Sequence, residues 1–220
     1  KKYNILVLSD EIYSDLTFEN NFKSISEYCP ENTIISNGLS KWCGAGGWRL
    51  GYFVIPNQYL KLMETMKILA SETFTSVSAP IQYAAIKAFE SNQKKYLEKS
   101  KNILKHLGNY VYDKLKSNNV LISKPQGGFY LMPEFLSKKF DTAEDMCNDI
   151  LSKTGVATLP GSDFGFSKKR MLIRISFTDF DGNKFMKNIS PYEKIDIHKI
   201  NKFAPKIVQG TDKLKAWVES

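Results

Sequence analysis

Short apolar runs that stop at polar residues are the feature that most restricts how this chain can fold. Residues 4–8, 33–36 and 51–55 are such runs, and Pro56 ends the third one. Continuous apolar runs of this length are typical of strands buried in the middle of an α/β sheet. The sequence therefore predicts an α/β fold, in which ligands bind beyond the carboxyl ends of the strands.

Helical spacing of apolar residues dominates the next stretch, from Asn57 to about Asn118. Ser78-Ala79-Pro80 predicts a helix start, because proline is tolerated in the first turn of a helix. A lysine-rich segment further on carries an apolar stripe, which predicts a long helix linking two lobes. The stripe consists of Leu104, Leu107, Val111 and Leu115. The same spacing occurs earlier at Leu60, Met63, Met66 and Ala70.

Beyond residue 120 the pattern predicts a second, smaller α/β layer. A capping-box pattern at Asp141–Glu144 predicts a helix that ends at Gly155. The expected strands cover residues 120–122, 129–131, 156–159 and 171–175, with a turn at 125–128 between the first two. We expect a closing helix over residues 202–218, with these side chains facing inward: Ile207, Leu214, Trp217 and Val218. Residues 178–200 predict no regular structure.

Composition argues against several classes of function. The formal net charge is +8, but the excess is almost all lysine scattered along helical stretches, which is typical of a solvated surface rather than a nucleic-acid site. No apolar stretch is long enough to span a bilayer, and the first residues do not resemble a signal peptide. Three distant cysteines and two isolated histidines favour neither a disulfide framework nor a metal site. We therefore expect a reducing, cytoplasmic location and neither a membrane nor a nucleic-acid partner.

Side chains that suit a phosphorylated aldehyde cofactor follow the first two predicted strands. Asp10 and Tyr13 come after the first apolar run, and Ser40-Lys41 opens a loop of small residues after the second. Arg49 stands eight positions beyond Lys41 in a chain with only three arginines. A neutral lysine amine attacks carbonyl groups, and arginine clamps phosphate with paired donors. If the two strands are parallel, Asp10 and Lys41 lie at the same edge of the sheet.

Each candidate residue also has a simpler interpretation. Lys41 could be a surface lysine in a flexible loop, Asp10 could cap a helix after a strand, and Arg49 could form a surface ion pair. Arg174, at the end of the last predicted strand, could bind a carboxylate ligand or pair with an acid such as Asp179. The residue types alone leave these alternatives open.

Five ordered segments together resemble landmarks of the fold-type I pyridoxal phosphate-dependent enzymes, in particular the class I and II aminotransferases of the aspartate aminotransferase type. The segments are Asp10-Glu11-Ile12-Tyr13, Ser40-Lys41 with Gly47-Trp48-Arg49-Leu50-Gly51-Tyr52, Gly127-Gly128-Phe129-Tyr130-Leu131, Pro160-Gly161-Ser162-Asp163-Phe164-Gly165, and Arg174-Ile175-Ser176-Phe177. The resemblance covers most of the chain. It implies an α/β fold made of a partial large domain of the aspartate aminotransferase-like fold and a complete small α/β domain.

The resemblance also implies a role for each residue of the first lobe. Lys41 would form a Schiff base with pyridoxal 5'-phosphate. Asp10 would face the pyridine nitrogen and keep the ring protonated, and Tyr13 would reach the phenolic oxygen of the ring. Ser40 and Arg49 would hold the phosphate.

The order of the landmarks implies that the chain corresponds to the C-terminal portion of an aminotransferase. Residues 1–92 would be the C-terminal part of the large cofactor-binding domain, and residues 93–220 the linking helix and the small C-terminal domain. The family's glycine-containing phosphate loop, ring-stacking aromatic residue and Asn-Pro segment have no counterpart in this sequence. Gly38 stands where some members carry a phosphate-binding serine.

The activity implied by the resemblance is transamination of an amino acid to an oxo acid by a biosynthetic, homodimeric enzyme. Arg174 would bind the α-carboxylate of the substrate, and Lys41 would move the proton. Two alternatives remain open. One is a carbon–sulfur β-lyase of the same fold, which shares these residues, and the other is a catalytically silent fragment that lacks the N-terminal cofactor loop.

Overall fold

Two parallel strands and one antiparallel strand form the sheet that carries the predicted lysine loop. In the computed structural model, which describes residues 2–19 and 21–220, the order is β1 (Val7–Asp10), β2 (Thr33–Gly38) and β3 (Gly51–Val54). β1 runs parallel to β2, with Asp10 opposite Ser36, whereas β3 is antiparallel to β2. Because β1 and β2 are parallel, Asp10 and the loop that carries Lys41 follow strand ends at the same edge of the sheet.

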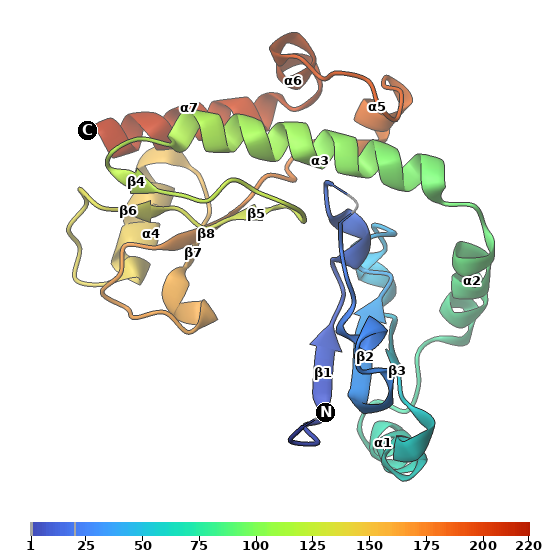
Figure 1. Cartoon of the computed structure of the whole chain (residues 1–220). Coiled ribbons are helices and arrows are strands. Elements are labelled where there is room, and N and C mark those ends of the chain that lie inside the picture. The colour runs from blue at the N-terminus through green and yellow to red at the C-terminus, as the bar shows by residue number, and fades with distance from the viewer. Residues whose placement is uncertain (1, 20) are drawn as a thin grey trace. The chain divides into compact units, whose positions relative to one another are not determined.

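The chain divides after Leu97 into two compact units, Lys1–Leu97 and Glu98–Ser220. The first unit contains this sheet and two helices, α1 (Leu60–Thr73) and α2 (Ala79–Glu90), which Figure 1 shows after the sheet along the chain. Pro80 lies in the first turn of α2, after Ser78 at the N-cap, as the sequence predicts. The predicted domain boundary, between residues 92 and 93, lies just before α3 (Lys94–Leu115).

The second unit is organised around α3 and a small set of short strands. The predicted apolar stripe of α3 is buried at all four positions, from Leu104 to Leu115. The short strands are β4 (Val120–Leu121), β5 (Tyr130–Leu131), β6 (Glu134–Phe135), β7 (Leu159–Pro160) and β8 (Ile173–Ser176). β8 is the middle strand of the order β5-β8-β7, and β4 pairs with β6. The helices are α4 (Ala143–Thr154), α5 (Gly182–Lys187), α6 (Ile197–Phe203) and α7 (Pro205–Glu219).

Helix α7 closes the second unit against α4 and the strands. The Trp217 indole donates a hydrogen bond to the Asp149 carboxylate of α4 at 2.7 Å, and its ring meets Phe135 edge-on at a centroid distance of 5.6 Å. Ile207 and Leu214 are buried beside it, so the inward face of the predicted closing helix is confirmed at these positions.

Several expectations for the second unit are wrong in detail. The closing helix begins at Pro205 rather than residue 202, because residues before it form the separate helix α6, and Val218 is only partly buried. The segment expected to be irregular contains α5 and α6, each opened by an aspartate that caps the helix (Asp181 and Asp196). Thr142, not Asp141, caps α4, and its hydroxyl accepts the Asp145 N–H at 3.1 Å.

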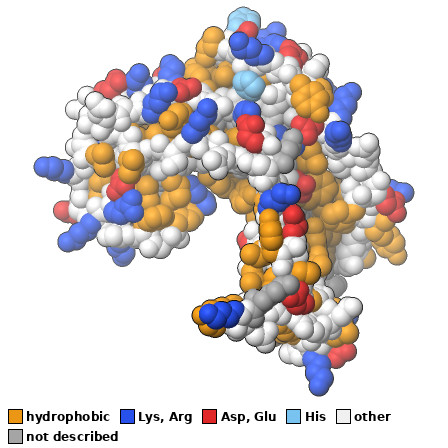
Figure 2. Space-filling view, in the orientation of Figure 1, with side chains coloured by type: hydrophobic (Ala, Val, Ile, Leu, Met, Phe, Trp, Pro, Cys, Tyr) orange, Lys and Arg blue, Asp and Glu red, His pale blue; other side chains and the backbone are white. Residues whose placement is uncertain are grey.

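The first unit leaves much apolar surface uncovered. Helix α1 buries no side chain despite its regular apolar spacing, and α2 buries only Ala85. Large apolar side chains are exposed on both helices, among them Ile68, Leu69, Tyr83 and Ile86. In the space-filling view, apolar side chains reach the molecular surface in many places (Figure 2). One buried cluster of this unit consists of Leu39, Trp42, Ala45 and Ala85.

Candidate active site

The carboxyl end of β1 presents Asp10 and Tyr13. Asp10 is the last residue of the strand and is exposed, and its carboxylate accepts the Ile12 N–H at 3.3 Å. Tyr13 is half-buried and precedes a 3₁₀ turn, Ser14–Leu16. Asp10 therefore closes a local turn and does not cap a helix, which removes the simpler interpretation of this residue.

The loop between β2 and β3 is a folded structure with its own core. Gly38 pairs with Gly51 at its base, and the Leu39 N–H donates to the Leu50 carbonyl at 3.2 Å. Within the loop, the Ala45 N–H donates a hydrogen bond to the Leu39 carbonyl at 3.2 Å. Leu39 is fully buried, as 0% of it is exposed. Lys41 and Arg49 thus emerge from one anchored loop, not from a flexible one.

Lys41 lies against Tyr13. Its half-buried side chain places Nζ 5.5 Å from the centroid of the Tyr13 ring, a cation–π geometry. The two residues follow β1 and β2, and the parallel pairing of these strands brings their carboxyl ends to one edge. This contact unites the two halves of the predicted site in the first unit.

Arg49 is held by its own loop and keeps donors to spare. It has a left-handed backbone (φ 54°) after the turn Gly46–Trp48, and Nη1 donates to the Gly46 carbonyl at 2.8 Å. Its side chain is exposed, and within residues 2–19 and 21–220 no carboxylate forms an ion pair with it. Because a guanidinium has five N–H donors, most of them remain available for an anion.

Two glycines of this loop, Gly38 and Gly47, differ in the space around them. A Cβ on Gly38 would lie 2.7 Å from the Leu50 carbonyl oxygen. Position 38 therefore has no room for the serine that some members of the family named above carry. A Cβ on Gly47 would meet nothing within 4 Å. Gly47, two residues before Arg49, is therefore an open position of the loop.

The donor set of this edge fits pyridoxal phosphate. It contains an exposed carboxylate for a ring nitrogen, a phenol and an amine in contact, a hydroxyl at Ser40 and a guanidinium with free donors. These groups match the ring, the aldehyde and the phosphate of that cofactor in turn. The fit rests on residues Asp10 to Arg49, all within the first unit.

Burial affects the titration of two neighbours of this site. Burial raises the pKa of the Tyr52 phenol on β3, and the negative charges of Asp15 and Glu11 raise it further. Burial also raises the pKa of the Cys43 thiol, so this cysteine is a poor nucleophile at neutral pH. Neither side chain was assigned a role from the sequence.

Arg174 belongs to the second unit, on β8, and is clamped between aromatic rings. Its guanidinium carbon lies 4.3 Å from the Tyr130 ring centroid and 4.2 Å from that of Phe164. Asp179, the acid considered as its partner, instead accepts a hydrogen bond from Lys206 at 3.2 Å. Stacking fixes the plane of the guanidinium and leaves its N–H edge free to bind a carboxylate as a fork.

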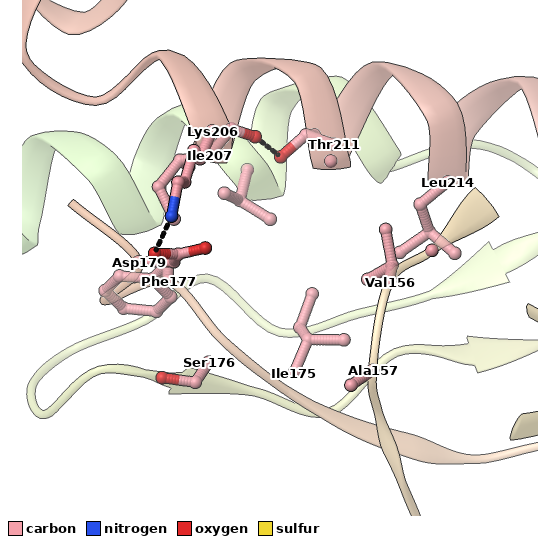
Figure 3. Close-up of a pocket in the computed structure, with 13 residues that line it drawn as sticks. Val156, Ala157, Ile175, Ser176, Phe177, Asp179, Lys206, Ile207, Thr211 and Leu214 are labelled. Atoms are coloured by element: carbon pink, nitrogen blue, oxygen red, sulfur yellow. Dashed lines mark hydrogen bonds and ion pairs between the residues drawn. The ribbon is translucent and has the colours of Figure 1, made fainter. Parts of the chain in front are cut away.

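A cavity of about 360 Å³ lies in the second unit, away from Arg174. Figure 3 shows Leu214, Ile207 and Val156 around it, with the Lys206–Asp179 ion pair at one end. Arg174 is not among the residues that line this cavity, although its neighbour Ile175 is. No sequence motif indicated the cavity, because its lining comes from four separated segments.

Two further findings concern metal binding and membrane-spanning helices. Among residues 2–19 and 21–220, no group of three or more histidine, cysteine or acidic side chains is arranged to hold a metal ion. No helix in the described part of the chain is both long and apolar enough to cross a bilayer.

Comparison with protein families and curated sequences identifies related chains. Residues 1–185 match the model of the family described as aminotransferase class I and II. A probable N-acetyl-LL-diaminopimelate aminotransferase of Bacillus subtilis is 36% identical over 177 residues, which cover 80% of this chain and 44% of the relative. An aspartate aminotransferase of Sulfolobus acidocaldarius is 31% identical over 183 residues, with the same coverage of 80% and 44%.

Solved structures give the same result for the fold. An alanine aminotransferase from Pyrococcus furiosus superposes with a TM-score of 0.79 at 27% identity, covering 99% of this chain and 50% of that one. An aspartate aminotransferase from Thermotoga maritima gives a TM-score of 0.72 at 26% identity, covering 100% and 49%. The chain therefore spans about half the length of the relatives that it matches.

Proposed function

The chain belongs to the class I and II aminotransferase family, whose members depend on pyridoxal phosphate, and from this premise we propose that it transfers the amino group of an amino acid to an oxo acid with Lys41 as the residue that carries the cofactor. The expected α/β fold of the aspartate aminotransferase type is confirmed. Because the chain spans about half of its relatives, the activity is a proposal about the whole enzyme to which such a chain contributes.

The contact between Lys41 and Tyr13 is the observation that carries this proposal. It joins an amine from the loop after β2 to a phenol from the turn after β1, at the sheet edge where α/β proteins bind ligands. Lys41 is half-buried in a loop anchored by the fully buried Leu39, which fits a held side chain better than a free surface lysine. The geometry supports an amine that is held in place for covalent chemistry.

The other residues at this edge of the sheet bind different parts of the cofactor. Arg49 and the Ser40 hydroxyl bind its phosphate, and the Asp10 carboxylate holds a proton on its ring nitrogen. When bound, pyridoxal phosphate supplies an electron sink for the electrons left at the substrate Cα. Lys41 Nζ would take the proton from the substrate Cα and pass it to the cofactor carbon within the same half of the cycle, the second half would run the transfer in reverse, and the Tyr13 phenol would orient the amine.

Substrate binding falls to Arg174 in this proposal. Its guanidinium, stacked between Tyr130 and Phe164, binds the α-carboxylate shared by amino acids and oxo acids. The relatives' names point to aspartate, alanine and related amino acids as donors. We further propose that the enzyme is a cytoplasmic homodimer.

Amino-group transfer by the 220-residue chain tests the proposal. The purified chain is incubated with pyridoxal phosphate, aspartate and 2-oxoglutarate, and glutamate formation is measured. We expect Lys41→Ala to lower the rate by about 10²–10⁴-fold, the usual contribution of a positioned proton-transfer group. Lys61→Ala, which removes an exposed lysine of α1, should keep the wild-type rate.

The same preparation separates the alternatives. Release of ammonia and pyruvate from cystathionine without transfer to the oxo acid would identify a carbon–sulfur β-lyase. Absence of both reactions would identify a catalytically silent fragment and contradict the proposal for this chain.

A further inference from the structure

Glu11 is a buried carboxylate next to the site that the proposed function does not use. Only 8% of it is exposed, although it directly follows the exposed Asp10. Acidic side chains are rarely buried without partners, because an unpaired charge is costly to remove from water. Its position therefore calls for an explanation from its contacts.

Two serine hydroxyls from different parts of the chain bind Glu11. Ser24 donates to Oε1 at 2.5 Å, and Ser9 donates to the same oxygen at 3.1 Å. Ser24 is itself fixed, because it caps the 3₁₀ turn Ile25–Glu27 with a complete capping box. The backbone N–H of Glu11 donates to the Ser36 carbonyl of β2 at 2.9 Å. Glu11 thus ties the end of β1 to two neighbouring segments.

The orientation of Glu11 decides the orientation of Asp10. Consecutive residues of a strand point to opposite faces, and Ser9 and Glu11 share the inner face while Asp10 points outward. A slip of one residue would exchange the two carboxylates between the faces. The hydrogen bonds from Ser9 and Ser24 stabilise the register in which Glu11 is buried and Asp10 is exposed.

We propose that Glu11 is a positioning residue that locks the register of the β1 end, so that Asp10 and Tyr13, and not Glu11, face the cofactor edge. The inference rests on the proposed function for the role of Asp10 and Tyr13. The lock itself is a property of the chain without cofactor. Its test is therefore chosen to be independent of cofactor binding.

Amide hydrogen exchange of the 220-residue chain without cofactor measures the lock. In Glu11→Ala, we expect the amides of residues 11, 12 and 14 to exchange at least about tenfold faster, since a charged partner of two partly buried hydroxyls is lost. In Glu11→Gln, which keeps an oxygen that accepts from Ser24, the rates should stay within about threefold of wild type. Glu64→Ala, which removes an equal charge from the exposed face of α1, should change none of them.

A spectroscopic signature separates positioning from general stability. Lys41 Nζ lies over the Tyr13 ring, so the ring current should shift the Lys41 ε-methylene protons upfield. We expect this shift to disappear in Glu11→Ala, to persist in Glu11→Gln, and to be reduced in Ser24→Ala. If Glu11→Ala does not fold, the Glu11→Gln and Ser24→Ala variants provide the test.

Two results would overturn the inference. One is exchange at residues 11–14 within twofold of wild type in Glu11→Ala with an unchanged Lys41 shift. The other is a Glu11→Gln variant as perturbed as Glu11→Ala, because the hydroxyl bonds would then not be the lock. If the wild-type chain does not carry cofactor on Lys41, the proposed function is contradicted. The amide exchange rates and the Lys41 chemical shift would be unaffected, so the positioning role of Glu11 would still stand.

Discussion

Lys41 and Gly38 show how single residues shape the site. The lysine is presented by a loop whose base closes through Gly38 and Gly51, and any side chain at position 38 would meet the Leu50 carbonyl oxygen. Some members of the family carry a serine at this position. In this chain the close approach of the two strand ends leaves no room for that side chain, and we propose that Ser40 and Arg49 bind the phosphate instead.

The steric role of Gly38 leads to a prediction about stability. Gly38→Ala should destabilise the first unit by about 1–3 kcal/mol, the typical cost of forcing an extra group into a packed site. Gly47→Ala, in the same loop, should change stability by less than about 0.5 kcal/mol, because its Cβ would meet nothing within 4 Å. Urea unfolding of both variants measures the difference, and equal midpoints would contradict the steric account.

At the scale of residues, the sequence indicates which side chains are candidates for binding and catalysis, but it does not show which contacts hold them in place. The residue types and order indicated Asp10, Tyr13, Lys41 and Arg49, and their roles remain predictions. The burial of Glu11 could not be predicted, because it depends on hydroxyls that lie far from it in the chain, such as Ser24. The stacking of Arg174 between two rings likewise needs the pairing of β5 with β8.

At the scale of elements, local signals predicted the starts and ends that depend on one or two residues. Ser78 and Pro80 open α2, and Gly155, with φ of 73°, ends α4. The start of α4 was wrong by one residue, because either Asp141 or Thr142 could cap it. Thr142 was selected because its hydroxyl reaches the Asp145 N–H. Helices α5 and α6 were missed since each is too short for an apolar period to appear.

The α4 cap gives the element-scale prediction. Thr142→Ala should lower the free energy of unfolding by about 1 kcal/mol, and the melting temperature by about 2–4 °C, because the Asp145 N–H loses its acceptor. Ser152→Ala, which removes a hydroxyl within the same helix that bonds the Asp149 carbonyl, is the control and should have a smaller effect. Calorimetry of both variants tests this, and a larger loss in the control would count against the capping role.

At the scale of the whole molecule, the two units differ in how well they bury apolar surface. The second unit has a continuous core around α3, α7 and the strands, whereas α1 of the first unit buries nothing. The apolar spacing over residues 60–70 predicted a helix, and α1 confirms it, but no residue of α1 is buried in this chain. Extended apolar patches of this kind are typical of interaction surfaces.

Self-association of the chain tests the role of this surface. Ile68 and Leu69 on α1 are 66% and 62% exposed, so we expect the 220-residue chain to associate. The double variant Ile68→Glu/Leu69→Glu should shift it toward monomer in sedimentation velocity. Leu151→Glu, at an exposed leucine of α4 in the second unit, should not. A wild-type chain that stays monomeric at high concentration would contradict the proposed homodimer.

The ion pair between Glu134 and Arg170 predicts how stability depends on pH. Arg170 donates to both carboxylate oxygens of Glu134, at 2.9 and 2.5 Å, and this hydrogen bonding holds the pKa of Glu134 below its ordinary value. The unfolded chain therefore binds the proton more readily, so the pair stabilises the fold above the ordinary glutamate pKa of about 4.3 and its contribution is lost as the pH falls below that.

Thermal unfolding of Arg170→Gln measures this contribution. The variant should melt a few degrees below wild type at pH 7, and the difference should shrink toward pH 3. Lys116→Gln, which breaks an exposed pair between the residue after α3 and Asp113 in its last turn, should show almost no difference at either pH. A difference for Arg170→Gln that is the same at both pH values would refute the role of the Glu134 charge.

Borohydride reduction of the 220-residue chain with pyridoxal phosphate, followed by peptide mass mapping, tests the central claim most directly. We expect a pyridoxyl group on Lys41 alone, absent in Lys41→Ala and retained in Lys61→Ala. Modification scattered over many lysines, or no modification, would contradict the assignment of Lys41 as the cofactor-carrying residue of this chain.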